Sequence, residues 1–226
     1  MKYSNLIIFV SELLGTFGLL VAATGSIVYD SSLGNTLGPI FVAAIHFLGL
    51  AIVVYAFGKY SMAHFNPAVT IGFFISGYVK AKALPVYFVA QAIGAFLGTL
   101  FVKYVIGSFA ELGLNFPNHS YSIPIFYGVE IIATILLMGV ILTVVHVKGL
   151  NKLTGLAVGG IIALDVYFLG PVSGASMNPI RSLAPAIVSG IPDDLWLYLT
   201  APFIGSAIVG VVYYKKFSKF KHQEQF

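Results

Sequence analysis

The sequence predicts an all-α membrane protein with six transmembrane helices and two re-entrant half-helices arranged in an inverted repeat. Three features predict this fold: long apolar segments, two short apolar segments that each begin with Asn-Pro, and an internal repeat. Of the 226 residues, 58% are hydrophobic and only 9% are charged. A soluble domain usually carries about 25% charged residues, so the composition argues against a soluble enzyme. Because the chain has no cysteine, disulfide scaffolds and cysteine metal sites are excluded.

Six apolar segments are long enough to cross a bilayer. A helix needs about 20 residues to cross ~30 Å of hydrocarbon. The segments lack the strict alternation of membrane-spanning strands, so we expect helices. The first segment has no small-residue cleavage pattern, and we expect it to be a retained helix and not a signal peptide. The six segments cover residues 6–28, 39–57, 84–106, 123–145, 153–169 and 195–214.

Two further apolar segments, 67–76 and 179–189, are about half as long as a membrane span. Each follows an asparagine and opens with proline. Apolar segments of this length are typical of re-entrant pieces, which enter the membrane and return to the same side. The sequence therefore predicts two half-helices in addition to the six spans.

The basic residues indicate the orientation of the spans. If the N-terminus is cytoplasmic, ten of the twelve basic residues fall on the cytoplasmic side, as the positive-inside rule requires. The acidic residues Asp30, Glu111, Asp193 and Asp194 then fall outside. We expect both termini to be cytoplasmic. The ten basic residues are Lys2, Lys59, Lys80, Lys82, Lys148, Lys152, Lys215, Lys216, Lys219 and Lys221.

The chain repeats itself after about half its length. ELLGT at 12–16 recurs as EIIAT at 130–134, and FNP at 65–67 recurs as MNP at 177–179. Each half holds three spans and one half-helix. Because three is odd, the second half must enter the membrane from the opposite side. We expect one channel domain over 1–226, built from inverted repeats at approximately 1–110 and 120–220.

The two Asn-Pro pairs have a physical role at the start of a half-helix. Proline is tolerated at the first helical position, and asparagine before it is a good N-cap. The side-chain oxygens of Asn66 and Asn178 would accept from the helix starts, which leaves their amide groups free to donate elsewhere. Both helix dipoles would also direct positive ends to the same place. Such a centre binds acceptors such as a water oxygen and repels cations, including protons.

AHFNPAVT at 63–70 and SGASMNPIRS at 173–182 resemble the two signature loops of the aquaporin, or major intrinsic protein, family. The resemblance implies a multi-pass protein of the cell membrane with one pore per subunit, usually four subunits, and no cofactor. Ile180 stands where the family usually has alanine, which would crowd the packing behind Asn178. Met62 stands where the family often has glycine, which would disturb the loop turn. The motif residues are Asn66, Pro67, Ala68, Asn178, Pro179 and Ile180.

The resemblance also implies a constriction. Arg181 is the only arginine in the chain, and an intramembrane arginine is a functional candidate. The matching positions on the second helix, the fifth helix and the second loop are His46, Val166 and Ala175. This set most resembles the plant vacuolar-membrane (tonoplast) subgroup, which is associated with water and with ammonia or urea.

Glu12 and Glu130 are intramembrane carboxylates on the first and fourth spans. The family resemblance implies that each carboxylate accepts hydrogen bonds from a re-entrant loop, since backbone donors at membrane depth need partners. His64 and Gly174 resemble loop residues whose backbone lines the pore. An alternative assigns Glu12 and Glu130, with Asp165, to proton relay in a secondary transporter.

The leading functional hypothesis is a passive channel for water and small neutral solutes, including ammonia, that excludes protons and ions. The first alternative is a glycerol facilitator, and a proton-coupled transporter is a less favoured one. A third possibility is an adhesive membrane protein with a vestigial pore. The sequence has no nucleophile–base pair, no metal-ligand cluster and no phosphate loop, so it predicts no catalytic residue, no metal and no cofactor.

Overall fold

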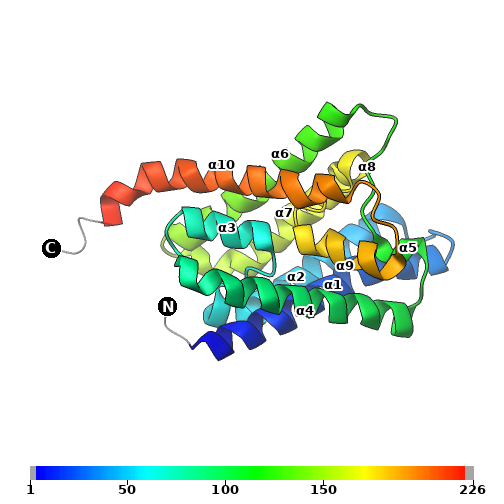
Figure 1. Ribbon diagram of the computed structural model, residues 1–226, viewed down its shortest axis with the longest axis horizontal. Helices are drawn as coiled ribbons and strands as arrows, with labels where there is room; N and C mark the ends of the chain where they lie inside the picture. Colours follow the sequence, from blue (N-terminus) through cyan, green and yellow to red (C-terminus); the bar gives the residue numbers. More distant parts are fainter. Residues whose placement is uncertain (1–3, 222–226) are drawn as a thin grey trace.

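The computed structural model describes residues 4–221, which fold into a bundle of helices (Figure 1). The α-helices that it contains are α1 (Asn5–Ser32), α2 (Gly38–Ser61), α3 (Pro67–Ile75), α4 (Leu84–Phe101), α5 (Ala110–Gly113), α6 (Ile123–His146), α7 (Thr154–Phe168), α8 (Gly170–Ser173), α9 (Pro179–Ser189) and α10 (Leu195–Lys221). Short 3-10 turns precede α4 and α7, at Ala81–Ala83 and Leu150–Leu153. A π-helical turn, Val102–Ile106, extends α4.

Six helices are long and apolar enough to cross a membrane, as the sequence predicts. With the short turns that flank α4 and precede α7 included, the spans agree with the predicted segments to within four residues at every end except the last, where α10 continues to Lys221 beyond the predicted end at residue 214. Most of the differences are extensions beyond the apolar core, such as the last turn of α1 up to Ser32. The predicted all-α membrane fold is therefore confirmed.

The two half-helices α3 and α9 lie end to end between α4 and α10 (Figure 1). Asn66 caps α3, because its side-chain oxygen accepts from the Ala68 amide at 2.8 Å. Asn178 caps α9 in the same way, accepting from the Ile180 amide at 3.2 Å. Each cap satisfies an amide at the helix start that would otherwise be buried without a partner.

Glycines allow the long helices to pack closely. A side chain at Gly94 of α4 would place its Cβ 2.3 Å from the Leu13 carbonyl oxygen of α1. A Cβ at Gly159 of α7 would lie 2.7 Å from the Phe47 carbonyl oxygen of α2. Small residues at these positions bring the helix backbones together, which is how membrane helices associate without a hydrophobic driving force.

The first and last described residues lie at the same end of the molecule (Figure 1). The basic segments around Lys59, Lys80, Lys148 and Lys215 lie at this end too, because each follows or precedes a span that terminates there. Lys2 lies outside the described residues. The arrangement is consistent with the charge asymmetry on which the predicted orientation rests.

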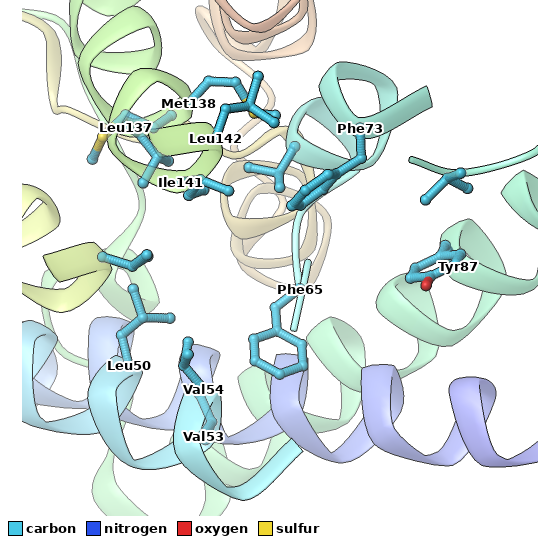
Figure 2. Close-up of a cluster of buried hydrophobic side chains, with 14 of the residues drawn as sticks. Leu50, Val53, Val54, Phe65, Phe73, Tyr87, Leu137, Met138, Ile141 and Leu142 are labelled. Carbon is cyan, nitrogen blue, oxygen red and sulfur yellow. The ribbon is translucent and has the colours of Figure 1, made fainter. Parts of the chain in front are cut away.

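The first re-entrant loop is anchored by Phe65. Its ring is fully buried and points from the loop toward α1 and α2, near Val53 and Val54 (Figure 2). The ring occupies the space beside Gly15, where an added Cβ would lie 1.9 Å from a ring carbon. The glycine therefore makes the pocket that holds the loop against α1.

Ile180 does not crowd the second loop. Its side chain is only 5% exposed and packs with Leu20, Ala95 and Ala184, two of which are small enough to leave room for it. Ile180 fits because Ala95 and Ala184 have small side chains that leave space for it. The sequence motif alone does not show which residues are its neighbours.

Replacing Ile180 with alanine, the usual family residue, is therefore expected to destabilise this protein. The substitution leaves a cavity and should lower the free energy of unfolding by about 2–4 kcal/mol. Thermal unfolding of the detergent-solubilised protein measures the change. Ile187→Ala on the same helix, where the side chain is 58% exposed, is the matched control. Equal melting temperatures for the two variants would contradict the assigned packing.

Candidate functional site

The two Asn-Pro loops meet and exchange hydrogen bonds. The Asn66 amide nitrogen donates to the Met177 carbonyl at 2.8 Å, and the Asn178 amide nitrogen donates to the Phe65 carbonyl at 2.9 Å. The expectation that both amides are free to donate elsewhere is therefore only half right. An amide has two N–H donors, so each asparagine ties the halves together with one and retains the other.

Both loops use the same unusual backbone. Met62, Ala63 and Phe65 adopt left-handed conformations with φ of 68°, 51° and 50°. The corresponding residues of the second loop, Gly174, Ala175 and Met177, do so with φ of 83°, 43° and 54°. Met62 thus adopts the turn that glycine adopts in the second loop. Its substitution for the family's glycine costs conformational energy without preventing the turn.

Glu12 is completely buried on α1 and holds the first loop. One carboxylate oxygen accepts from the Ser61 hydroxyl at 2.6 Å and the His64 amide at 3.0 Å. The other accepts from the Phe65 amide and the Gln91 side chain, both at 2.8 Å. With four donors bound, this carboxylate supports the loop, as the family resemblance implies.

Glu130 has the equivalent place on α6 and is also completely buried. It accepts from the Ser173 hydroxyl at 2.9 Å, the Ser176 amide at 3.2 Å and the Met177 amide. All of these donors belong to the second re-entrant loop or the residues just before it. These contacts engage the carboxylate in the loop and weaken the alternative that it relays protons.

A narrow cavity runs past both loops. Its volume is about 60 Å³, which holds several water molecules, since one water needs ~10–15 Å³. The polar lining includes Asn66 and Asn178 from the two loops. Most of the other lining residues are apolar. The apolar wall comes from α1, α2, α6 and α7 and includes Leu19, Leu50, Val54, Leu137, Ile141, Val158 and Ile162.

The structure brings the four predicted constriction residues to this cavity: His46, Val166, Ala175 and Arg181 all line it. The Nδ1 atom of His46 lies 2.8 Å from the Val42 carbonyl oxygen of its own helix, which fixes the orientation of the ring. Val166 and Ala175 contribute small side chains. The set therefore combines an imidazole, a guanidinium and two short apolar groups around one passage.

Arg181 is 5% exposed, and its guanidinium is held in place by the outer loop between the third and fourth spans. Its Nη1 atom donates to the Gly113 carbonyl at 2.8 Å and to the side-chain oxygen of Asn115. The sequence reasoning missed Asn115, because the loop between the third and fourth spans has no periodicity from which a contact could be predicted. Gln91 was also missed, because it lies inside the predicted third span and no local pattern links it to Glu12 on α1.

His64 and Gly174 differ in their relation to the cavity. His64 lines it, while its ring is stacked between Phe73 and Tyr87 at centroid distances of 4.4 and 4.3 Å. Gly174 is not among the lining residues, and its carbonyl accepts from the Asn115 amide at 2.6 Å. The backbone oxygen predicted to line the pore is thus occupied by the outer loop.

Asp165 precedes Val166 on α7 and is 2% exposed. Its Oδ2 atom has no hydrogen-bond partner among the described residues. His119, at the outer end, pairs with Asp194 at 2.8 Å and is not among the residues that line the cavity. Over residues 4–221, no group of three or more His, Asp and Glu side chains is arranged to hold a metal ion.

Comparison with known proteins bears on this arrangement. The sequence model of the family described as "Major intrinsic protein" matches residues 1–213. The chain belongs to the major intrinsic protein family. Proteins of this family are channels and not enzymes.

Curated family members resemble the chain over most of its length. "Probable aquaporin NIP7-1" of Arabidopsis thaliana is 39% identical over 93% of this chain and 76% of its own length. "Aquaporin NIP1-1" of Zea mays is 39% identical over 87% of this chain and 70% of its own length. The resemblance of the constriction to the tonoplast subgroup is therefore not supported, since these relatives carry NIP-type names. Similarity over most of the chain outweighs the resemblance of four constriction residues.

A solved family structure has the same fold. The X-ray structure of the aquaglyceroporin from Plasmodium falciparum superposes with a TM-score of 0.83 at 28% sequence identity. The match covers 96% of this chain and 98% of that one. All six spans and both half-helices therefore belong to the family fold.

Proposed function

We propose that the protein is a passive channel for water and small neutral solutes that excludes protons and ions. The observation that carries the proposal is the amphipathic cavity that passes both Asn-Pro loops and the Arg181 side chain. The NIP-type relatives and the aquaglyceroporin structure support the same class of substrate. The polar side offers hydrogen bonds to the permeant, and the apolar side keeps its binding weak enough for rapid passage.

The midplane supplies the barrier to cations. Each half-helix directs the positive end of its dipole to the place where Asn66 and Asn178 meet. The remaining N–H of each asparagine amide donates to a passing water oxygen, so that water is oriented as an acceptor. A water oriented in this way cannot pass a proton along a continuous chain of hydrogen-bonded waters. The positive field also repels cations.

The constriction determines which neutral solutes pass. Val166 and Ala175 leave the opening wider than two aromatic side chains would, and His46 keeps one side polar. Ammonia resembles water in size and is a strong acceptor for the Arg181 guanidinium. We infer that water and ammonia pass, while ammonium is excluded by the positive field.

Glycerol is the second candidate solute. The long apolar wall from α6 and α7 favours it, because carbon atoms can lie against that wall while hydroxyl groups face the polar side. The similarity to an aquaglyceroporin points the same way. His46, however, leaves the constriction without the apolar wedge of two aromatics that glycerol filters use.

We also propose that both termini are cytoplasmic and that four copies assemble in the cell membrane, as the family resemblance implies. Most basic residues of the described chain, with Lys103 and Arg181 as the exceptions, lie at the end where α1 begins and α10 finishes. A shallow groove on the outer face of α2 and α7 contains Ala43, Ala44, Gly160 and Ala163. Small residues of this kind allow close packing of a neighbouring helix.

Reconstituted vesicles under an osmotic step test the proposal. We expect fast, light-scattering-detected shrinkage with no accompanying proton or ion current. A proton current coupled to solute uptake would instead favour the transporter, and shrinkage no faster than that of empty vesicles would favour a vestigial pore. A glycerol flux that rivals the water flux would establish the glycerol facilitator.

His46→Phe is expected to reduce ammonia flux more than water flux. The phenylalanine ring narrows the opening and removes a polar wall, so ammonia flux should fall by about tenfold, the effect of a barrier raised by ~1.4 kcal/mol. Ammonia is followed by the external pH shift and water by light scattering, in the same vesicles. An equal loss of both fluxes would mean that His46 does not discriminate between them.

A further inference from the structure

The position of the Arg181 side chain depends on one short piece of the outer loop. Both acceptors of its Nη1 atom, the Gly113 carbonyl and the Asn115 side-chain oxygen, come from this loop. Among the described residues, the other two guanidinium nitrogens have no protein acceptor. The guanidinium is thus fixed on one side and open toward the cavity that it lines.

Asn115 connects the outer loop to both ends of the second Asn-Pro motif. Its side-chain oxygen accepts from Arg181 and from the Ser182 hydroxyl at 2.9 Å, both in the first turn of α9. Its amide nitrogen donates to the Gly174 carbonyl at 2.6 Å, in the loop before the motif. Asn115 is 5% exposed, so these bonds form away from bulk water, where they are strong.

The backbone before Asn115 is shaped to hold it there. Ala110, Glu111, Leu112 and Gly113, the four residues of α5, are all left-handed, with φ between 43° and 68°, so α5 is a left-handed turn and not an ordinary right-handed helix. A Cβ at Gly113 would lie 2.9 Å from the Thr24 backbone of α1, so the turn is pressed against that helix. Such a turn persists only when its surroundings support it, and here it orients the Gly113 carbonyl and Asn115 toward Arg181.

We propose that Asn115 is a positioning residue that holds the Arg181 guanidinium back from the passage and thereby sets the width of the constriction. Asn115 is not among the residues that line the cavity, so it acts through Arg181 and not by touching the permeant. This inference rests on the proposed channel function and assigns a selectivity role to the outer loop.

The physical consequence follows from the donors of Arg181. Without the Asn115 oxygen, Nη1 keeps only the Gly113 carbonyl as an acceptor. A buried guanidinium that loses an acceptor turns toward other oxygens, and the accessible ones are those of the permeants in the cavity. Arg181 then extends farther into the passage and binds each permeant more tightly, which slows its passage.

The test uses the full-length protein in vesicles, with water flux divided by the amount of folded channel. Asn115→Leu should lower the water permeability per channel by roughly tenfold, the population ratio that corresponds to one lost hydrogen bond to a charged group. Asn115→Asp keeps an acceptor for Arg181 and should remain within about twofold of the parent protein, since only the donor to Gly174 is lost.

Two comparisons separate positioning from a merely structural role. In an Arg181→Ala background, Asn115→Leu should change the flux by less than about twofold, because residues that act through one another are not additive. Asn118→Ala is the matched control, since Asn118 lies in the same loop and donates to the Pro171 carbonyl without contacting Arg181. It should leave the permeability unchanged.

The outcomes are distinct. Equal flux in the parent and the Asn115→Leu variant overturns the inference, as does an undiminished effect of Asn115→Leu after Arg181 has been removed. A parent protein that conducts no water overturns the proposed function instead. A lower melting temperature for Asn115→Leu with unchanged flux per folded channel identifies a structural role and also overturns the inference.

Discussion

Glu12→Gln is expected to remove most of the folded, conducting protein. The carboxylate accepts four hydrogen bonds with two oxygens, and glutamine offers one oxygen and an NH₂ group that faces donors. Two of the four donors, including a backbone amide at membrane depth, would lose their acceptor. Each lost bond to a charged group costs about 1.5–3 kcal/mol, so the loss approaches the total stability of an ordinary domain.

Thermal unfolding and the yield of folded protein measure this effect. Glu111→Gln is the matched control, because Glu111 is an exposed carboxylate in the outer loop whose side chain supports no buried amide. It should leave the melting temperature within about 1 °C of the parent value. A stable Glu12→Gln protein with normal water flux would mean that the first loop does not depend on this carboxylate.

Replacing both Asn66 and Asn178 with leucine should reduce water flux by at least about tenfold, which corresponds to a barrier raised by ~1.4 kcal/mol. The double variant loses the donors that orient water where the half-helices meet. It also loses two helix caps and both hydrogen bonds between the loops. Stability should therefore fall too, by about 1 kcal/mol for each cap and 1–3 kcal/mol for each carbonyl left without a partner.

Water flux must be compared per folded channel, since fewer molecules will assemble. Asn151→Leu, at an exposed position before α7, controls for the loss of an asparagine and should have no effect on flux. If the double variant assembles and conducts water at the parent rate, these asparagines do not lie on the water path and the proposed midplane is wrong.

Much of the architecture could be predicted because it depends on local properties of the chain. The length of an apolar segment fixes whether it can span a bilayer, which is why all six spans were predicted and α6 was located to within one residue at each end. Asn-Pro before a half-length apolar segment predicted both N-caps. The family resemblance, which the Asn-Pro motifs carry, implied that Glu12 and Glu130 support the loops, and both accept hydrogen bonds from loop amides.

Other features could not be predicted because they depend on residues far apart in the chain. Asn115 lies 66 residues before Arg181, and Gln91 lies 79 residues after Glu12. The accommodation of Ile180 required knowledge that Ala95 and Ala184 face it. No periodicity or motif encodes such pairs.

By itself, the sequence determined that this chain crosses the membrane six times, that two half-helices enter it, and that asparagine and arginine side chains are placed at the loops. Only the tertiary structure decided that the Asn66 and Asn178 amides each donate one hydrogen bond to the opposite loop. It also decided that the Gly174 carbonyl accepts from Asn115 and that the outer loop anchors Arg181. The physical reason is that local composition fixes which segments leave water, whereas a buried polar group takes whichever partner the packing of distant segments brings within hydrogen-bonding distance.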